Sequence, residues 1–182
     1  ATDVFVRDRQ TGTTQRVSIG GTSTQANGDS PWLGDASGVS ADGRYVVFSS
    51  VATNLVTGDT NGIADVFIRD RTLNTTTRLS VSTSGAQATG TSGSMSPRIT
   101  PDGRYIAFSS DATNLIAGDT NSDRDAFRRD RTTSTTIRVS LRDDDGQASG
   151  FAHSISDNGE RILFTSTVTG VTPNDNNAAP LW

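Results

Sequence analysis

The chain of 182 residues contains no cysteine and no lysine. Without cysteine, neither disulfide bonds nor thiol chemistry are available to the protein. All sixteen basic residues are therefore arginine, and the formal net charge is −4. The arginines recur at equivalent positions along the chain instead of gathering in one patch, so nucleic acid is not an expected partner.

Long apolar runs and amphipathic helices are also missing. No run approaches the length of a membrane span, and no window has the i, i+3, i+4, i+7 apolar spacing of an amphipathic helix. The eighteen glycines and the abundant Thr and Ser are instead typical of many short strands joined by turns. We therefore predict an all-β protein without membrane insertion. The Thr-, Ser-, Asn- and Gly-rich composition favours an exported bacterial protein, either extracellular or periplasmic.

An internal repeat fills the chain, with a period of about sixty residues. "DVFVRDR" at 3–9 returns as "DVFIRDR" at 65–71 and as "DAFRRDR" at 125–131. "ADGRYVVFSS" at 41–50 returns as "PDGRYIAFSS" at 101–110 and, more loosely, as "DNGERILFTS" at 157–166. Such self-similarity is the signature of a fold built by repeating one supersecondary unit.

Each repeat divides into four predicted strands. The first strands (37–40, 95–100 and 151–156) end in Asp-Gly or Asn-Gly turns, which are strong hairpin signals. The second strands (44–50, 104–110 and 160–166) are apolar runs typical of strands buried on both faces. The third strand is "DVFIRD" or its equivalent, and the fourth is "TQRVSI", "TTRLSV" or "TIRVSL". Gly12, Asn74 and Ser134 occupy the tight turns between third and fourth strands, where a left-handed residue fits.

Four antiparallel strands at a fixed period are typical of a β-propeller. "SPRITPDGRYIAFSS" at 96–110 resembles the first hairpin of the TolB-type propeller repeat. The residues that fall on that pattern are Ser96, Pro97, Thr100, Pro101, Asp102, Gly103, Ile106 and Phe108. The other copies depart at the two prolines, with Ser37 and Ala41 in one and His153 and Asp157 in the other. The resemblance implies a propeller fold, which TolB-like proteins use as an interaction scaffold or beside a peptidase, and it does not carry a function by itself.

The order of the strands predicts one domain, 1–182, with three blades per chain. The blades are 37–82, 95–140, and a split blade made of 151–182 plus 1–19. The resemblance to TolB makes three blades half of a six-bladed ring. Because soluble proteins avoid exposed strand edges, we predict a homodimer that closes the ring. In it, 151–166 of one copy pair with 3–19 of the other.

An acidic loop recurs before the third strand and predicts bound calcium. In one copy, oxygen-bearing side chains alternate at Asp119, Asn121, Asp123 and Asp125, a spacing that can direct several oxygens toward one hard cation. The second copy keeps Asp59, Asn61 and Asp65 and offers only a carbonyl oxygen at Ile63. The alternative is that these Asp and Asn side chains cap turns through nearby backbone N–H groups, with no metal.

The third copy of the acidic loop is divided between the two ends of the chain. Asp175 and Asn177 occupy the first two acidic-loop positions, while Asp3 is the equivalent of Asp65. In the predicted dimer, Asp175 and Asn177 of one copy would meet Asp3 of the other. The dimer would therefore rebuild the interrupted loop.

No set of residues predicts catalysis. His153 is the only histidine, no G-x-S-x-G motif accompanies it, and we interpret it as a degenerate repeat position. The Arg-Asp-Arg triplets at 7–9, 69–71 and 129–131 recur in every repeat, which indicates structural pairing between strands.

We therefore predict a non-enzymatic, calcium-stabilised scaffold or binding module for a protein or glycan ligand. The ligand is expected on the face that carries the long loops 20–36, 51–64, 82–94, 111–124, 141–150 and 167–178. The alternative is a carbohydrate-active enzyme, a polysaccharide lyase or glycosidase. It is disfavoured because the only tyrosines, Tyr45 and Tyr105, fall in strands predicted to be buried.

Overall fold

The computed structural model describes residues 1–21, 23–31, 37–91, 93–173 and 175. It contains two four-stranded antiparallel sheets. The first complete blade has the order β3 (Gly38–Val39), β4 (Tyr45–Ser50), β5 (Asp65–Asp70) and β6 (Thr75–Arg78). The second complete blade consists of β7 (Ser94–Ile99), β8 (Tyr105–Ser110), β9 (Asp125–Asp130) and β10 (Thr135–Arg138), again in chain order.

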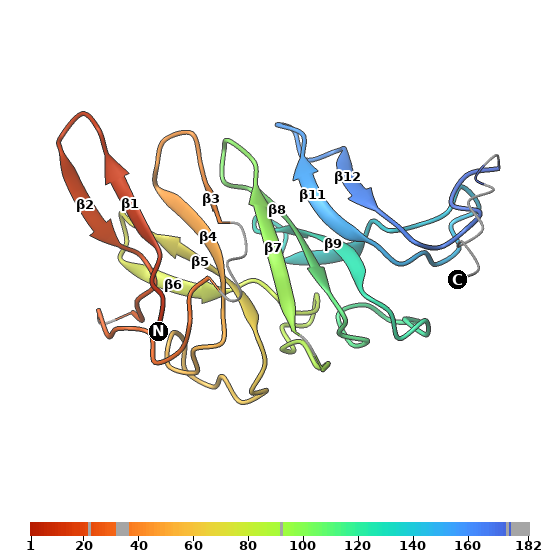
Figure 1. The fold of residues 1–182 in the computed structure, drawn as a ribbon, viewed down its shortest axis with the longest axis horizontal. Helices are drawn as coiled ribbons and strands as arrows, with labels where there is room; N and C mark the ends of the chain where they lie inside the picture. Colours follow the sequence, from red (N-terminus) through yellow and green to blue (C-terminus); the bar gives the residue numbers. More distant parts are fainter. Residues whose placement is uncertain (22, 32–36, 92, 174, 176–182) are drawn as a thin grey trace, which may run out of the picture.

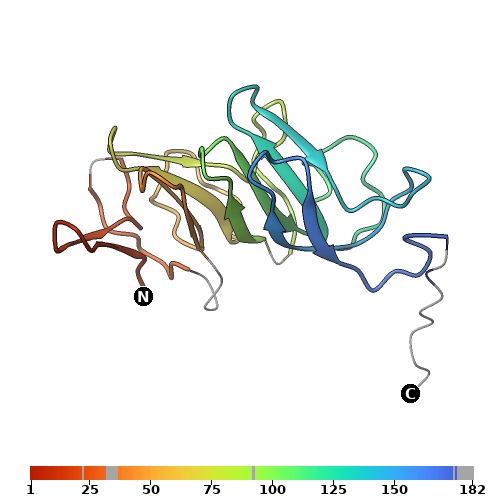
Figure 2. The same cartoon turned by 90° about the horizontal axis from the view of Figure 1, so that it is seen from above.

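Two further sheets have only two strands each. The N-terminal half-blade is β1 (Phe5–Asp8) with β2 (Thr13–Arg16), and the C-terminal half-blade is β11 (Phe151–Ile155) with β12 (Ile162–Thr165). Figure 1 shows the four sheets in a row in chain order, and Figure 2 shows the same open row from above, with a half-blade at each end. The predicted all-β fold with four-stranded antiparallel blades is confirmed. The described residues include no helix that could cross a membrane.

The fourth strands are shorter than predicted because a serine hydroxyl replaces part of the strand pairing. In each repeat, this hydroxyl accepts a hydrogen bond of 3.1 Å from a backbone N–H at the start of the third strand. The pairs are Ser18 with Val4, Ser80 with Val66, and Ser140 with Ala126. After this point each chain segment leaves the sheet and enters a long connection. The predicted left-handed turn residues are confirmed, with φ of 67° at Gly12 and 55° at both Asn74 and Ser134.

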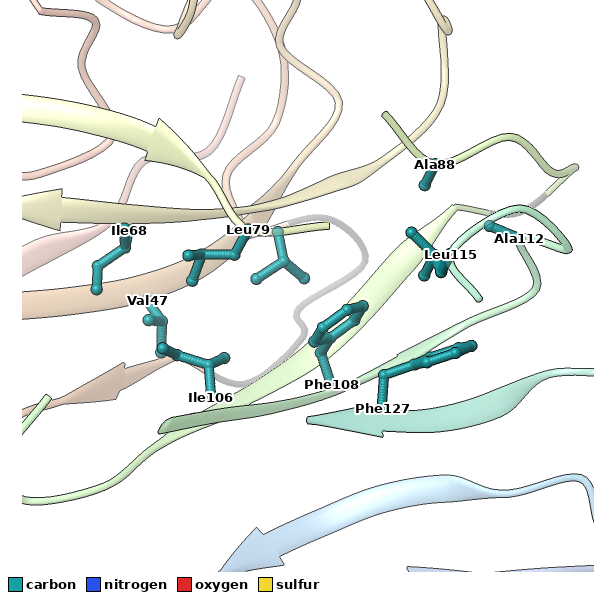
Figure 3. Close-up of a cluster of buried hydrophobic side chains, with 10 residues drawn as sticks. Val47, Ile68, Leu79, Ala88, Ile106, Phe108, Ala112, Leu115 and Phe127 are labelled. Atoms are coloured by element: carbon teal, nitrogen blue, oxygen red, sulfur yellow. The ribbon is translucent and has the colours of Figure 1, made fainter. Parts of the chain in front are cut away.

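The core lies between neighbouring sheets. Figure 3 shows Val47, Ile68 and Leu79 of the first complete blade in one cluster with Ile106 and Phe108 of the second. Within each complete blade, two phenylalanines of adjacent strands stack, with ring centroids 6.0 Å apart for Phe48–Phe67 and 5.7 Å apart for Phe108–Phe127. Burying such large apolar side chains is the main source of stability in a fold of this kind.

The half-blades leave equivalent apolar side chains uncovered. Phe5 of β1 is 55% exposed and Leu163 of β12 is 61% exposed. Their repeat equivalents in the first complete blade, Phe67 and Val47, are both 0% exposed. The difference arises because each complete blade has strands and a neighbouring sheet that the half-blades lack on their outer sides.

Candidate functional site

The acidic loops lie against a buried arginine that the sequence did not single out. In the first complete blade, the guanidinium of Arg78 lies 3.3 Å from Oδ1 of Asp59 and 3.5 Å from Oδ2 of Asp65. In the second, Nη2 of Arg138 lies 2.7 Å from Oδ1 of Asp119 and 3.3 Å from Oδ2 of Asp125. We call each set of one arginine and two aspartates an arginine clamp. Each clamp joins the long loop to the third and fourth strands.

Additional hydrogen bonds fix the second aspartate of each clamp. The hydroxyl of Ser80 donates to Asp65 at 2.5 Å, and that of Ser140 donates to Asp125 at 2.7 Å. Asn61 adds a side-chain amide bond to Asp65 at 3.0 Å. Burial raises the pKa of Asp65 and of Asp125, and these hydroxyls and the clamp arginines oppose that rise.

A glutamine recurs beside the acidic loop of each complete blade. Arg78 donates a hydrogen bond to Oε1 of Gln87, and Nε2 of Gln87 donates to the hydroxyl of Thr60 at 2.7 Å. Gln147 occupies the equivalent position and donates to Thr120 at 3.2 Å. These glutamines therefore anchor one long loop against another, as their repetition in the sequence suggests.

The asparagines of the acidic loops act as turn caps. Oδ1 of Asn61 accepts the N–H of Ile63 at 3.3 Å, and Oδ1 of Asn121 accepts the N–H of Asp123 at 3.1 Å. Side-chain bonds of this kind, two residues along the chain, are the turn-capping alternative to a metal site. Both the amide and the carbonyl of Asn61 therefore have a role within the loop.

Each acidic loop already has a guanidinium beside its two buried carboxylates. Calcium needs six to eight oxygen ligands, whereas each clamp offers two buried carboxylates already next to an arginine. Asp123 is exposed, and Ile63 could contribute only its carbonyl oxygen. Among the described residues, no three acidic or histidine side chains form a group that could hold a metal. Calcium in these loops stays a prediction.

The divided third copy contains half of a clamp. Arg16 lies 3.5 Å from Oδ2 of Asp3, and the hydroxyl of Ser18 donates to Asp3 at 2.6 Å. The side chain of Arg16 is 36% exposed, against 8% for Arg78. Asp175, the repeat equivalent of Asp59, lies in the last described part of the chain, beyond β12. Asn177 lies outside the described residues.

The other repeated charges have structural roles, as predicted. Asp70 and Asp130, at the centre of two Arg-Asp-Arg triplets, pair with Arg44 at 2.7 Å and with Arg104 at 2.8 Å. His153 lies in β11 and shares a hydrogen bond of 2.9 Å with the hydroxyl of Thr165 on the adjacent strand. These contacts hold strands together.

Two equivalent grooves lie at successive junctions between sheets. The first groove has a volume of about 490 Å³ and the second about 820 Å³. Hydroxyl and amide groups line both grooves, together with one leucine and one β-branched aliphatic side chain: Thr24, Asn54, Leu55, Val56, Thr57 and Thr76 in the first, and Thr113, Asn114, Leu115, Ile116 and Thr136 in the second. Asn54 and Asn114 fix their loops by donating to the carbonyls of Gln25 and Gln87 at 2.8 and 2.9 Å.

Comparisons with solved structures show the fold of a TolB-like β-propeller. TolB from Acinetobacter baumannii superposes with a TM-score of 0.52 and 21% identity, over 89% of this chain and 31% of that one. A TolB from Agrobacterium tumefaciens superposes with a TM-score of 0.45 and 22% sequence identity, over 71% of this chain and 36% of that one. The tricorn protease superposes with a TM-score of 0.52 and 14% sequence identity, over 90% of this chain and 13% of that one.

The chain thus spans about a third of the length of the TolB structures that it matches. No protein-family model matches the chain, and no curated protein matches its sequence.

Proposed function

We propose that the chain is a non-enzymatic propeller scaffold or binding module whose ligand, a protein or a glycan, contacts the long-loop face. The observation that carries this proposal is the pair of equivalent grooves beside the long loops. In Figure 1, the connections after β4 and β8 run along the lower edge, opposite the tight turns of β3–β4 and β7–β8. Loops held on a rigid sheet scaffold are where binding residues concentrate.

The chemistry of the grooves favours an extended glycan. Hydroxyl and amide groups can exchange hydrogen bonds with sugar hydroxyls, while the partly exposed Val56 in the first groove and Ile116 in the second offer apolar contacts. Since the two grooves repeat with the blades, a polymer of repeating sugars can contact both at once. Contact at two linked sites raises affinity beyond that of either site.

A groove-filling variant tests this proposal. Thr57 and Ala117 are exposed and occupy equivalent positions in the two grooves. In the double variant Thr57→Arg/Ala117→Arg, we expect calorimetric binding to a panel of neutral and acidic polysaccharides to weaken at least about tenfold. Leu73→Arg, at an exposed tight turn, is the control and should bind as the wild type does.

Two results would contradict the glycan assignment. Unchanged glycan affinity in the double variant would remove the grooves from the site. Binding of an extended peptide, with no glycan bound, would favour the protein ligand. Turnover of a polysaccharide that is lost in His153→Ala would instead support the carbohydrate-active enzyme and overturn the non-enzymatic proposal.

The proposal includes an exported protein, extracellular or periplasmic, which the Thr-, Ser-, Asn- and Gly-rich composition supports. It also changes the expected source of loop stability. The sequence predicts calcium for that role, whereas the arginine clamps place a positive charge between the same aspartates. We propose that the clamps hold the loops.

A further inference from the structure

A third cavity lies beside the first groove, at the junction between the two complete blades. It has a volume of about 570 Å³, within the range of about 300–1,000 Å³ that is typical of small-molecule sites. Val56 and Thr76 line both the first groove and this cavity, so a ligand chain in the groove can reach it. Two arginines, Arg78 of β6 and Arg129 of β9, also line the cavity, and we call it the arginine pocket.

Arg129 is a buried cation with neutral partners. The residue is 8% exposed, and its Nη1 donates to the carbonyl of Ser82 at 3.1 Å and to the hydroxyl of Thr136 at 2.9 Å. In the part of the chain that the structure describes, no carboxylate forms an ion pair with it, and its other N–H groups have no acceptor. The carboxylate of Asp130, the next residue, pairs with Arg104 instead. Because arginine stays protonated in proteins, this charge lacks the paired anion that a buried cation needs.

The second arginine of the pocket already has anionic partners. Arg78 lies beside Asp59 and Asp65 in its clamp, at 3.3 and 3.5 Å. The charge of Arg78 is therefore offset within the protein. Arg129 is the cation of the pocket that remains for a ligand.

The repeat provides a closed counterpart of Arg129. Arg69, the first arginine of the preceding Arg-Asp-Arg triplet, also has neutral partners, the hydroxyl of Thr76 at 3.2 Å and Oδ1 of Asn74 at 3.3 Å. It is 0% exposed, so a ligand has no access to it. Arg69 and Arg129 therefore share their position in the repeat and their kind of partner, and they differ in access from the arginine pocket.

We propose that the arginine pocket binds the negative charge of an acidic polysaccharide, a carboxylate or a sulfate on a sugar ring. This inference rests on the proposed glycan-binding function and adds a charge requirement to it. The sugar chain lies in the first groove, and its acidic group accepts charge-assisted hydrogen bonds from the N–H groups of Arg129 that have no acceptor. The planar guanidinium suits both acids, since it can donate two parallel hydrogen bonds to two oxygens of one group.

Calorimetric titrations with three polysaccharides test the charge requirement. Polygalacturonate supplies carboxylates, dextran sulfate supplies sulfates, and dextran is neutral. We expect Arg129→Gln to weaken the binding of the recognised acidic polysaccharide about tenfold and to change the affinity for dextran less. A loss with polygalacturonate alone identifies the carboxylate, and a loss with dextran sulfate alone identifies the sulfate. Arg129→Lys, which keeps the charge, should lose less affinity than Arg129→Gln.

Arg69→Gln is the matched control. It removes a buried arginine with the same kind of partners from the equivalent position of the preceding blade. Its affinity for the acidic polysaccharide should equal that of the wild type, whatever its loss of folding stability.

Thr57 offers a second test, because it is exposed and also lines the arginine pocket. Thr57→Asp should bind the acidic polysaccharide about threefold more weakly than Thr57→Asn, since the two variants differ by one negative charge. This comparison leaves the buried contacts of Arg129 in place. It therefore decides the matter if Arg129→Gln fails to fold, and equal affinity of the two Thr57 variants then overturns the inference.

The outcomes separate this inference from the proposed function. Equal affinity of the wild type and Arg129→Gln for both acidic polysaccharides, or an equal loss in Arg69→Gln, overturns the inference and leaves the glycan-binding function standing. Binding of dextran alone has the same consequence. If the wild type binds none of the three polysaccharides, the proposed function fails, and the inference fails with it.

Discussion

Nη2 of Arg138 lies 2.7 Å from Oδ1 of Asp119, and both side chains are almost wholly buried, 3% and 2% exposed. This pair connects the last residue of β10 to the long loop that leads into β9. Arg78 and Asp59 form the equivalent pair in the first complete blade, at 3.3 Å. In both complete blades, a guanidinium from the fourth strand lies next to the acidic loop, and we propose that this charge holds the loop.

Removing the arginine of a clamp should destabilise the protein strongly. Arg138→Gln leaves Asp119 and Asp125 buried without their cation, and breaking a buried ion pair in this way costs about 3–5 kcal/mol. The control is Arg44→Gln, because the Arg44 side chain is 35% exposed and its pair with Asp70 lies at the rim. An exposed ion pair contributes at most about 1 kcal/mol to the free energy of unfolding. Urea unfolding of both variants measures the difference, and equal losses would contradict a special role for the clamp.

The clamps also predict the response to calcium. If Arg78 and Arg138 supply the positive charge, the thermal midpoint should not change between a chelator and millimolar calcium. A bound ion would instead raise the midpoint with the logarithm of the calcium concentration. A calcium-dependent rise in the wild type that disappears in Asp119→Asn would restore calcium as the stabilising cation and contradict our account of the loops.

Acid should weaken the pair between Asp70 and Arg44. Hydrogen bonds from Arg44 lower the pKa of Asp70 from its ordinary 3.8 to about 2. Because the folded pKa lies below the unfolded value, the stabilisation is complete above pH 3.8 and is lost as the pH falls toward 2. Asp70→Asn keeps a side-chain oxygen that can accept the hydrogen bonds of the turn. Its free energy of unfolding should be about 1 kcal/mol lower than that of the wild type at pH 6, and the two values should converge near pH 2.

The measurement is the free energy of unfolding against pH for the two proteins. Asp123→Asn, which removes a carboxylate from the exposed part of an acidic loop, serves as the control. A constant difference between Asp70→Asn and the wild type from pH 6 to pH 2 would show that the ion pair does not contribute.

Much of the fold could be predicted from the sequence because the local signals agree with one another. The Asp-Gly turns at Gly43 and Gly103 and the left-handed positions at Asn74 and Ser134 mark the hairpins without reference to distant contacts. The apolar runs of the second strands mark which strands are buried. Repetition then joins these signals into one architecture, and the structure confirms it.

The arginine clamp could not be predicted in the same way because its members lie apart in the chain. Asp119 and Asp125 are close in sequence and suggested a metal loop, whereas Arg138 lies thirteen residues beyond Asp125 and becomes their neighbour only when β9 pairs with β10. One signal was present: an arginine stands two residues before a serine at 16, 78 and 138, in register with the acidic loops. That pattern becomes interpretable once the hairpin brings the residues together.

Binding of polysaccharides to the wild type and to Thr57→Arg/Ala117→Arg tests the central claim, a binding site in the two grooves, most directly. The account predicts that calorimetric affinity weakens at least about tenfold in the double variant and stays at the wild-type value in Leu73→Arg. Equal affinity of the wild type and the double variant would contradict the account.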